Sequence, residues 1–354
     1  ISTVFLHFCS CFLFTMETYA EVYDKPGVSL SKPLRIGEYS CHANFKVDSN
    51  ASNLRYLIHV DDDFKPNFNL DAGFKNHIAK NLKDNHNDLI QIQKWAISQW
   101  DHCYDYNKVF HKAEIVCGRG TLTDIAQTPY QEEDAWRMVA VRHNGITYVS
   151  NRRRFTPPES QKDAHCAYWG HKFHKVMTST SSNLEGVKLG KSDNYEVVDC
   201  RETYSAVYRT DIIKPDGDRI KLAYYSKIKA IDEKDNYVDF KTHAGHLSND
   251  FWHKKAWFWW LQCHFASVDR VYTGIRSDIG IVHKIQIVER NFLRLKGGKR
   301  CDIVLNFLAT VLSEVKKRCE DTLQISYSPE TRRVHFSTAK RDTDFLIRDF
   351  LKTW

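Results

Sequence analysis

Two short runs of alternating residues constrain the fold of this 354-residue chain more than any other feature. Residues 224–229 (Tyr-Tyr-Ser-Lys-Ile-Lys) and residues 237–241 (Tyr-Val-Asp-Phe-Lys) are rich in aromatic and branched side chains, which favours β-strands. Alternate side chains of a strand share a face, so Lys227 and Lys229 are expected on one face, about 7 Å apart. The sequence therefore predicts two neighbouring strands that each present charged side chains in register.

The charged residues of the second run form an acid-x-Lys triplet, Asp239-Phe240-Lys241. Such a triplet, facing a strand with ionisable residues two positions apart, is the usual core of a metal-dependent nuclease. Metal ions of that kind prefer carboxylate oxygen. The first run instead offers two lysines, so the pattern indicates a phosphodiesterase-like framework whose metal site is inverted in charge.

The remaining elements predict an α+β fold with mixed, largely antiparallel sheets flanked by helices. A strong turn signal, Asn144-Gly145, joins two of the strands. Asn249 or Asp250 is expected to cap the aromatic-rich third helix. The expected helices are 85–101, 163–176, 249–265, 302–318 and 342–352; the expected hairpins are 138–149, 268–288 and 323–337; further strands are expected at 203–207 and 220–228.

Composition sets only broad limits on function. Apolar residues make up 42% of the chain, enough for a sizeable core, and no Cys-x-x-Cys pair suggests zinc. The formal net charge of +7 permits an anionic partner without requiring one. We expect one domain over residues 16–354. Residues 1–15 are apolar but too short to span a bilayer; either translation starts at Met16 or they form a signal or anchor segment.

Several spaced motifs together resemble the decapping exonucleases of the DXO type and their RAI-like yeast relatives. No single motif is decisive, but their order and spacing are similar to the family's over nearly the whole chain from about Leu34. The motifs are Leu54-Arg55-Tyr56, residues 66–74, Gly118-Arg119-Gly120, residues 168–174, Lys227-Ile228-Lys229, Asp239-Phe240-Lys241 and residues 259–262.

This resemblance implies a PD-(D/E)xK-like nuclease core and an activity on RNA 5′ ends. Family members remove triphosphate, incomplete-cap or NAD-type ends, using magnesium or manganese held by acidic residues. The resemblance also implies a monomer in the nucleus or cytoplasm, no membrane partner, and a 5′-to-3′ exoribonuclease as a further partner. It assigns catalytic roles to Asp239 and Lys241, and substrate contacts to Arg55, Gly118, Arg119, Gly120, Ser205, Lys241 and Gln262.

The family's metal-ligand positions fall on His174, Lys227, Lys229, Asp239 and Phe240. His174, Lys227 and Lys229 replace acids, and Asp239 is shorter than the family's glutamate. At about 5 Å and an effective dielectric of about 20, each ammonium would repel a divalent ion by about 6–7 kcal/mol. We therefore expect no bound metal here. The leading hypothesis is a family member that binds RNA 5′ ends or nucleotides with lost or reduced hydrolysis, a pseudoenzyme in the pathway of RNA quality control.

Alternatives remain open at the level of sequence. The chain could be an active nuclease with a rearranged metal site that uses Asp232, Glu233 or Asp239, or a protein-interaction module without a nucleic-acid role. Individual residues also have ordinary structural interpretations: His174 as a surface histidine, and the two lysines as a solvated strand face.

Overall fold

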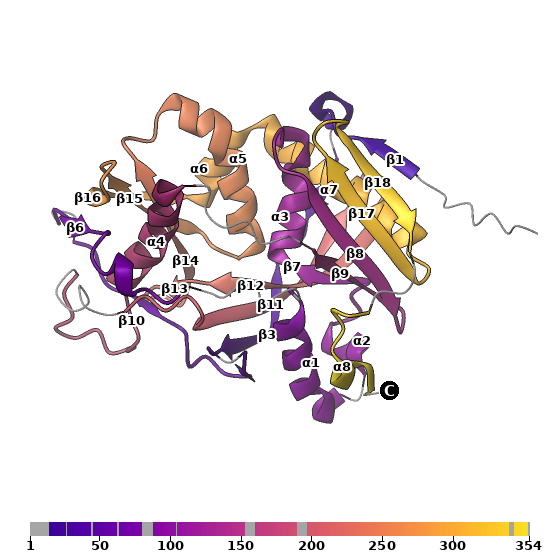
Figure 1. Ribbon diagram of the computed structural model, residues 1–354, viewed down its shortest axis with the longest axis horizontal. Coiled ribbons are helices and arrows are strands. Elements are labelled where there is room, and N and C mark those ends of the chain that lie inside the picture. The colour runs from indigo at the N-terminus through magenta and orange to yellow at the C-terminus, as the bar shows by residue number, and fades with distance from the viewer. Residues whose placement is uncertain are drawn as a thin grey trace, which may run out of the picture.

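Two β-sheets form the frame of the protein (Figure 1). The computed structural model describes residues 14–25, 27–43, 45–61, 64–79, 88–103, 105–152, 160–189, 197–339 and 343–352. No helix in this part of the chain is long and apolar enough to cross a membrane.

The larger sheet has eleven strands and is mostly antiparallel. Only β7 pairs in parallel, with β12 on one side and β9 on the other. The order is β1 (Phe14–Glu17), β18 (Arg333–Thr338), β17 (Thr322–Ser328), β8 (Trp136–His143), β9 (Ile146–Asn151), β7 (Ile115–Gly118), β12 (Arg219–Ile228), β11 (Thr203–Ile213), β3 (Leu34–Cys41) and β4 (Val47–Asp48), with β2 (Ser29–Leu30) beside β11.

The smaller sheet has seven strands, of which β14 and β15 form its parallel centre. Its order is β10 (Thr178–Ser179), β5 (Tyr56–Leu57), β13 (Ala230–Ile231), β14 (Tyr237–Ala244), β15 (Arg270–Arg276), β16 (Ile281–Glu289) and β6 (Phe68–Asn69). The two strand-forming runs, residues 224–229 and 237–241, therefore lie in different sheets and do not pair with each other. Strand β12 belongs to the larger sheet and β14 to the smaller.

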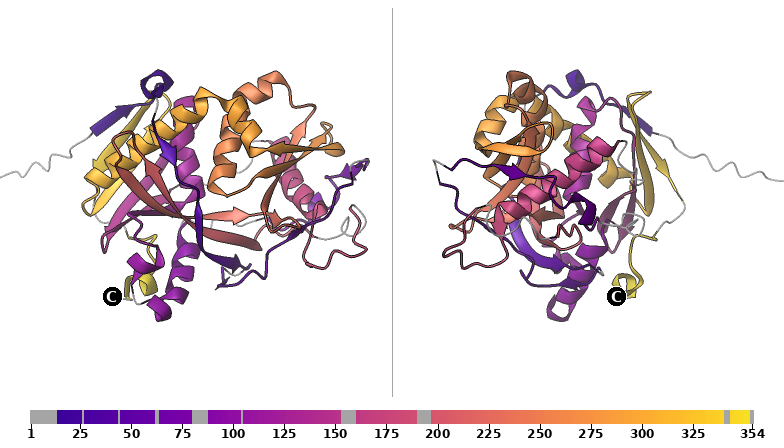
Figure 2. Two further views of the ribbon diagram at one scale, coloured as in Figure 1. Left: turned by 180° about the vertical axis from the view of Figure 1, so that it is seen from behind. Right: turned by 60° about the vertical axis from the view of Figure 1, so that its left-hand side comes forward.

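Helices cover both sheets in three groups (Figures 1 and 2). The first group, α3, α5 and α7, packs together beside the strands, and α6 packs against α5. The second group, α1, α2 and α8, gathers below the larger sheet, and α4 lies on the smaller sheet against β14. Their bounds are α1 Ile90–Cys103, α2 Tyr106–Val109, α3 Arg119–Gln127, α4 Gln161–Val176, α5 Asn249–Phe265, α6 Arg290–Gly297, α7 Lys299–Arg318 and α8 Arg348–Lys352.

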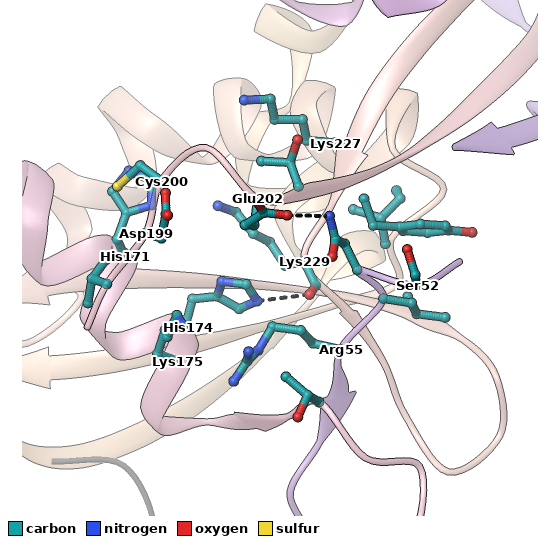
Figure 3. Close-up of a pocket in the computed structure, with 17 residues that line it drawn as sticks. Ser52, Arg55, His171, His174, Lys175, Asp199, Cys200, Glu202, Lys227 and Lys229 are labelled. Carbon is teal, nitrogen blue, oxygen red and sulfur yellow. Dashed lines mark hydrogen bonds between the residues drawn. The ribbon is translucent and has the colours of Figure 1, made fainter. Parts of the chain in front are cut away.

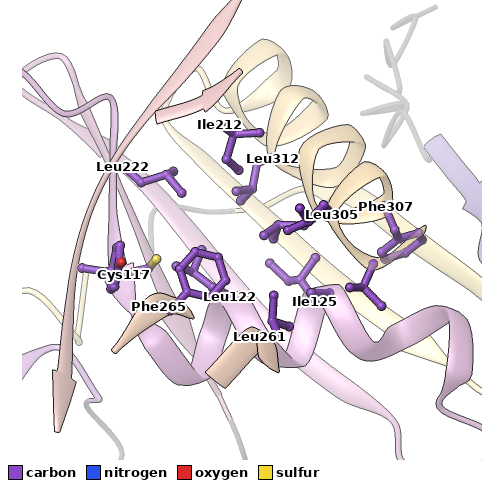
Figure 4. Packing of buried hydrophobic residues seen from close by; sticks show 14 of the residues in the cluster. Cys117, Leu122, Ile125, Ile212, Leu222, Leu261, Phe265, Leu305, Phe307 and Leu312 are labelled. Carbon is purple, nitrogen blue, oxygen red and sulfur yellow. The ribbon is translucent and has the colours of Figure 1, made fainter. Parts of the chain in front are cut away.

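Each helix group buries its own apolar cluster. The largest cluster joins α3, α5 and α7 to strands of both sheets, with Leu122, Phe265 and Leu312 in its interior (Figure 4). Strand β12 is buried from both sides, because Leu222 enters this cluster while its neighbour Ala223 enters the cluster under α1. A strand covered on both faces is held rigidly in place; Lys227 lies near its end and Lys229 directly after it, at the site described below.

The predicted fold class and most predicted elements are confirmed. The structure contains all three expected hairpins, including the turn at Asn144, which has the positive φ of 50° expected for this signal. The expected cap of α5 is wrong: Ser248, one residue earlier, accepts a hydrogen bond from the Phe251 amide at 3.2 Å. Serine competes well for this position because its short hydroxyl reaches the free amides of the first turn.

The first and last predicted helices are also longer than the observed ones. The first begins at Ile90, and residues 85–87 lie outside the described residues. The last is helical only from Arg348 to Lys352, and residue 342 lies outside them. The segment just before α8 is held in a non-helical form by Gln93 of α1. The Gln93 side-chain amide donates a hydrogen bond to the Phe345 carbonyl at 2.7 Å and accepts one from the Ile347 amide at 2.8 Å.

The packing of α4 on the smaller sheet depends on a glycine and yields a first prediction. A Cβ at Gly274 would lie 2.8 Å from the Phe173 ring of α4. We expect Gly274→Ala to destabilise the protein by about 1–3 kcal/mol through overpacking, measured by urea unfolding. Gly170→Ala is the matched control on α4, where a Cβ meets no atom within 4 Å. Equal stability of the two variants would contradict this account of the α4 contact.

Candidate functional site

The chain passes from the larger sheet to the smaller one at Lys229, between the end of β12 and the start of β13. His174, near the end of α4, donates a hydrogen bond from Nε2 to the Lys229 carbonyl oxygen at 2.8 Å (Figure 3). The same helix end is held by Arg55, which donates to the Thr178 hydroxyl at 2.7 Å and to the Thr178 carbonyl at 3.0 Å. Helix α4 and the sheet junction are thus fixed to each other.

Asp239 and Lys241 meet this junction from β14. Their side chains form an ion pair of 3.5 Å and are each less than one-fifth exposed. Lys241 also donates to the Gln262 side-chain oxygen of α5 at 2.7 Å and lies 5.1 Å from the centre of the Trp259 ring. The acid-x-Lys triplet is therefore anchored by α5, and the oxygen of Gln262, a residue to which the resemblance assigns a substrate contact, accepts a hydrogen bond from Lys241.

Electrostatic coupling shows that Lys229, Asp239 and Arg119 share one environment. Burial pushes the pKa of Asp239 up, but the surrounding cations, Lys241 first, outweigh burial and hold this pKa below its ordinary value. Burial is the largest cause that lowers the pKa of Lys229, and Asp239 only partly opposes it. The guanidinium of Arg119 acts on both groups in the direction expected of a nearby cation.

Arg119 reaches this environment because α3 begins directly after β7. Gly118 is the residue before the helix, and a Cβ there would lie 3.1 Å from the Tyr225 ring on β12. Gly120 is exposed, and a side chain at this position would meet no atom within 4 Å. The two glycines that flank Arg119 therefore serve different purposes. Gly118 allows β7 to approach β12 closely, and Gly120 leaves the surface beside Arg119 open.

A cavity of about 260 Å³ opens beside the junction (Figure 3). Four cationic residues line it, Arg55, Lys175, Lys227 and Lys229, beside His171 and His174, whose pKa values burial lowers. Two acids also line it: Asp199 pairs with Arg201 at 2.7 Å, and Glu202 accepts hydrogen bonds from His42 and from Asn53, another lining residue, at 2.9 and 3.0 Å. The cavity therefore presents a positive surface.

Two of the predicted site residues, Ser205 and Phe240, have buried side chains that do not line the cavity. Ser205 pairs with Lys227 across β11 and β12, but it is fully buried and lines no part of this cavity. The Phe240 ring is buried among Phe173, His174 and Tyr272, so only its backbone borders Asp239. The interpretation of His174 as a surface histidine is wrong, because this side chain is partly buried and bonded to the junction.

His171, Lys175 and Cys200 line the cavity but were missed from the sequence. A signal was present for two of them, since positions 171, 174 and 175 share one face of a helix. Cys200 carried none, because only the fold brings its loop beside α4.

The described residues do not form a carboxylate site for divalent metal. No group of three or more His, Cys, Asp or Glu side chains within them is arranged to hold a metal ion. Near the junction, the nitrogen His174 Nε2 is committed as a donor to a carbonyl, and Asp239 is paired with Lys241. Magnesium and manganese prefer several carboxylate oxygens, so this donor set does not fit the metals that the resemblance implies.

Comparison with solved structures defines the class of protein to which this fold belongs. Rai1 of Scheffersomyces stipitis, in complex with (3′-NADP)+ and calcium ion, matches with a TM-score of 0.79 and 16% identity over 93% of this chain and 98% of that chain. Rai1 of Candida albicans, in complex with pU5-Mn2+, matches with a TM-score of 0.78 and 18% identity over 96% and 98%. The chain therefore shares the fold of these Rai1 structures.

The sequence comparison identifies the family. Residues 31–354 match the model of the RAI1 like PD-(D/E)XK nuclease, and the chain belongs to this family. It is 25% identical over 305 residues to the decapping nuclease dom-3 of Caenorhabditis elegans, covering 81% of this chain and 76% of that protein. It is 22% identical over 323 residues to the decapping and exoribonuclease protein of Bos taurus, covering 84% and 78%.

The charge of the cavity wall leads to a prediction for His171. Burial first, and then repulsion of the protonated ring by Lys229 and Lys227, lowers the pKa of His171 to about 4. Lys229→Met removes one repelling charge, so the pKa of His171 should rise toward its ordinary value. NMR titration of the His171 ring measures this change. Lys254→Met, on an exposed lysine paired with Asp250, is the control and should leave it unchanged; a pKa unaffected by Lys229→Met would contradict the described wall.

Proposed function

We propose that this protein binds phosphorylated 5′ ends of RNA and does not cut them. The observation that carries the proposal is the set of cations around one carboxylate: Asp239 forms an ion pair of 3.5 Å with Lys241, and Lys229 and Arg119 also act to lower its pKa. The charge balance of this group is positive, which suits an anion and opposes a divalent cation. The single predicted metal-site acid that remains an acid is already neutralised by Lys241.

Two of these cations, Lys229 and Arg119, have N–H groups that can donate hydrogen bonds to a ligand. Within the described residues, neither the Lys229 ammonium nor the Arg119 guanidinium donates a hydrogen bond to a protein acceptor, whereas Lys241 donates to Gln262. A phosphate group supplies several acceptor oxygens and negative charge at once. Arginine binds phosphate in a planar, two-pronged manner, and lysine acts as a point charge that can replace a metal's charge without activating water.

The nature of the ligands in relatives agrees with this class of anion. The Candida albicans structure holds pU5 with Mn2+, and the Scheffersomyces stipitis structure holds (3′-NADP)+ with calcium ion. Both ligands carry phosphate groups. We infer that the present chain keeps the phosphate-binding part of such a site and replaces the metal's positive charge with lysine.

Binding should therefore be independent of metal and sensitive to salt. We expect 5′-triphosphate RNA to bind in EDTA, with a log–log slope of affinity against salt of about −2 to −3, as three or four neutralised phosphates require for a single strand. Filter binding against 5′-hydroxyl RNA of the same sequence measures it. Lys229→Met should weaken binding about 10–100-fold, whereas Lys254→Met should not. No preference for the triphosphate end would refute the proposal.

The main rival is an active nuclease with a rearranged metal site. Asp232 does not favour it, because this buried carboxylate pairs with Arg270 and accepts from the Lys234 and Asn236 amides at 2.9 Å each. Incubation with triphosphate-capped and NAD-capped RNA plus manganese separates the two functions. Hydrolysis that is lost in Asp239→Ala would establish the enzyme instead. A pure interaction module, by contrast, predicts no salt-sensitive RNA binding at all.

Reversing the charge of the site gives a direct test of the metal argument. The triple variant His174→Glu, Lys227→Glu, Lys229→Asp supplies three carboxylates beside Asp239, so we expect it to bind manganese in calorimetry while the unaltered protein does not. Lys254→Glu is the charge control and should bind none. If the folded triple variant binds no manganese, then either the assumed correspondence of these positions or the account of the pocket is wrong.

A further inference from the structure

A second cavity, of about 430 Å³, adjoins the first. Leu54 and Tyr204 line both cavities, so the two share a wall. The second cavity lies between β3, the start of β14 and the end of α5, and its lining includes Arg35, Glu38, Tyr208 and Tyr237. A charged pair and three tyrosines thus stand next to the basic cavity.

The polar groups of this cavity form one connected network. Arg35 Nη1 donates to the Glu38 carboxylate at 3.1 Å and to the Tyr237 hydroxyl at 2.9 Å. The Tyr204 hydroxyl donates to the same Glu38 oxygen, Oε2, at 2.5 Å. The network fixes the two tyrosine rings and the charged pair relative to each other, so the cavity is preorganised rather than formed around a ligand.

The network leaves hydrogen-bonding atoms available at its open side. Glu38 uses only Oε2 and Arg35 only Nη1 within the described residues, so Oε1 and the other guanidinium nitrogens have no protein partner there. The two side chains are 35% and 55% exposed, so a ligand in the cavity can reach them. An acceptor and a donor stand side by side, with aromatic rings nearby.

We propose that this cavity is a nucleobase subsite that receives the first nucleoside of the RNA whose 5′ phosphates occupy the basic cavity. A nucleobase edge offers an N–H next to an acceptor, which matches Glu38 Oε1 and the free donors of Arg35. Its flat faces stack on an aromatic side chain such as Tyr237, which lines this cavity and is only partly buried. This inference rests on the proposed function, because it takes the phosphates to lie against Lys229.

A comparison of ligands with and without a base tests the subsite. Inorganic tripolyphosphate and the nucleoside triphosphates ATP, GTP and UTP are titrated in EDTA by calorimetry. For the unaltered protein we expect the nucleotides to bind on the order of tenfold more tightly than tripolyphosphate, as stacking of one base supplies. The double variant Arg35→Ala, Glu38→Ala removes one charge of each sign, so it should lose this preference and keep its affinity for tripolyphosphate.

A second variant protects the test against a local folding defect. Ala51 also lines the cavity, and Ala51→Phe adds a large side chain there while both charged residues stay as they are; it should reduce nucleotide affinity in the same way. Equal binding of tripolyphosphate and nucleotides by the unaltered protein would overturn the subsite and leave the proposed function intact. A preference that survives in both variants would also overturn it. Binding of none of the ligands, together with no binding of triphosphate RNA, would overturn the proposed function itself.

Discussion

The hydrogen bond from His174 to the Lys229 carbonyl is the contact on which the geometry of the site depends. It lies where the chain leaves one sheet and enters the other, and it ties this junction to α4. A buried carbonyl without a donor costs about 1–3 kcal/mol. An ionised glutamate at position 174 accepts hydrogen bonds but cannot donate one. Histidine at position 174 therefore does two things together: it adds no negative charge, and it supplies the donor that holds the junction.

The cations of the site divide into one that is anchored and two that are available. Lys241 is held by Asp239, Gln262 and the face of Trp259, so its position is set by β14 and α5. Lys229 and Arg119 follow directly from the ends of β12 and β7, where buried strands fix the backbone. A cation without a bonded acceptor among the described residues is suited to an external one, and this contrast is the physical basis for preferring anion binding over catalysis.

Local signals in the sequence were sufficient for the hairpins and long helices, because their periodicity and turn residues act over a few positions. The hairpin around Asn144-Gly145 and the strand that ends at Ile228 are two elements that such local signals predicted. The separation of β12 and β14 into two sheets depends on pairings between distant residues and had no local signal. Resemblance to a family indicated the convergence of Arg119, Lys229 and Asp239, yet it gave no sign of the acids and Cys200 opposite α4, which come from an irregular loop.

The rigidity of the elements that carry Lys229, Lys241 and Arg119 has a consequence for the ligand-free protein. Folding brings like charges together whether or not an anion is present, so the empty site retains mutual repulsion that a flexible loop would relax. An anion bound there would act as a structural counterion between the two sheets. Its binding energy would include relief of that repulsion, and occupancy of the site would be coupled to the cohesion of the whole domain.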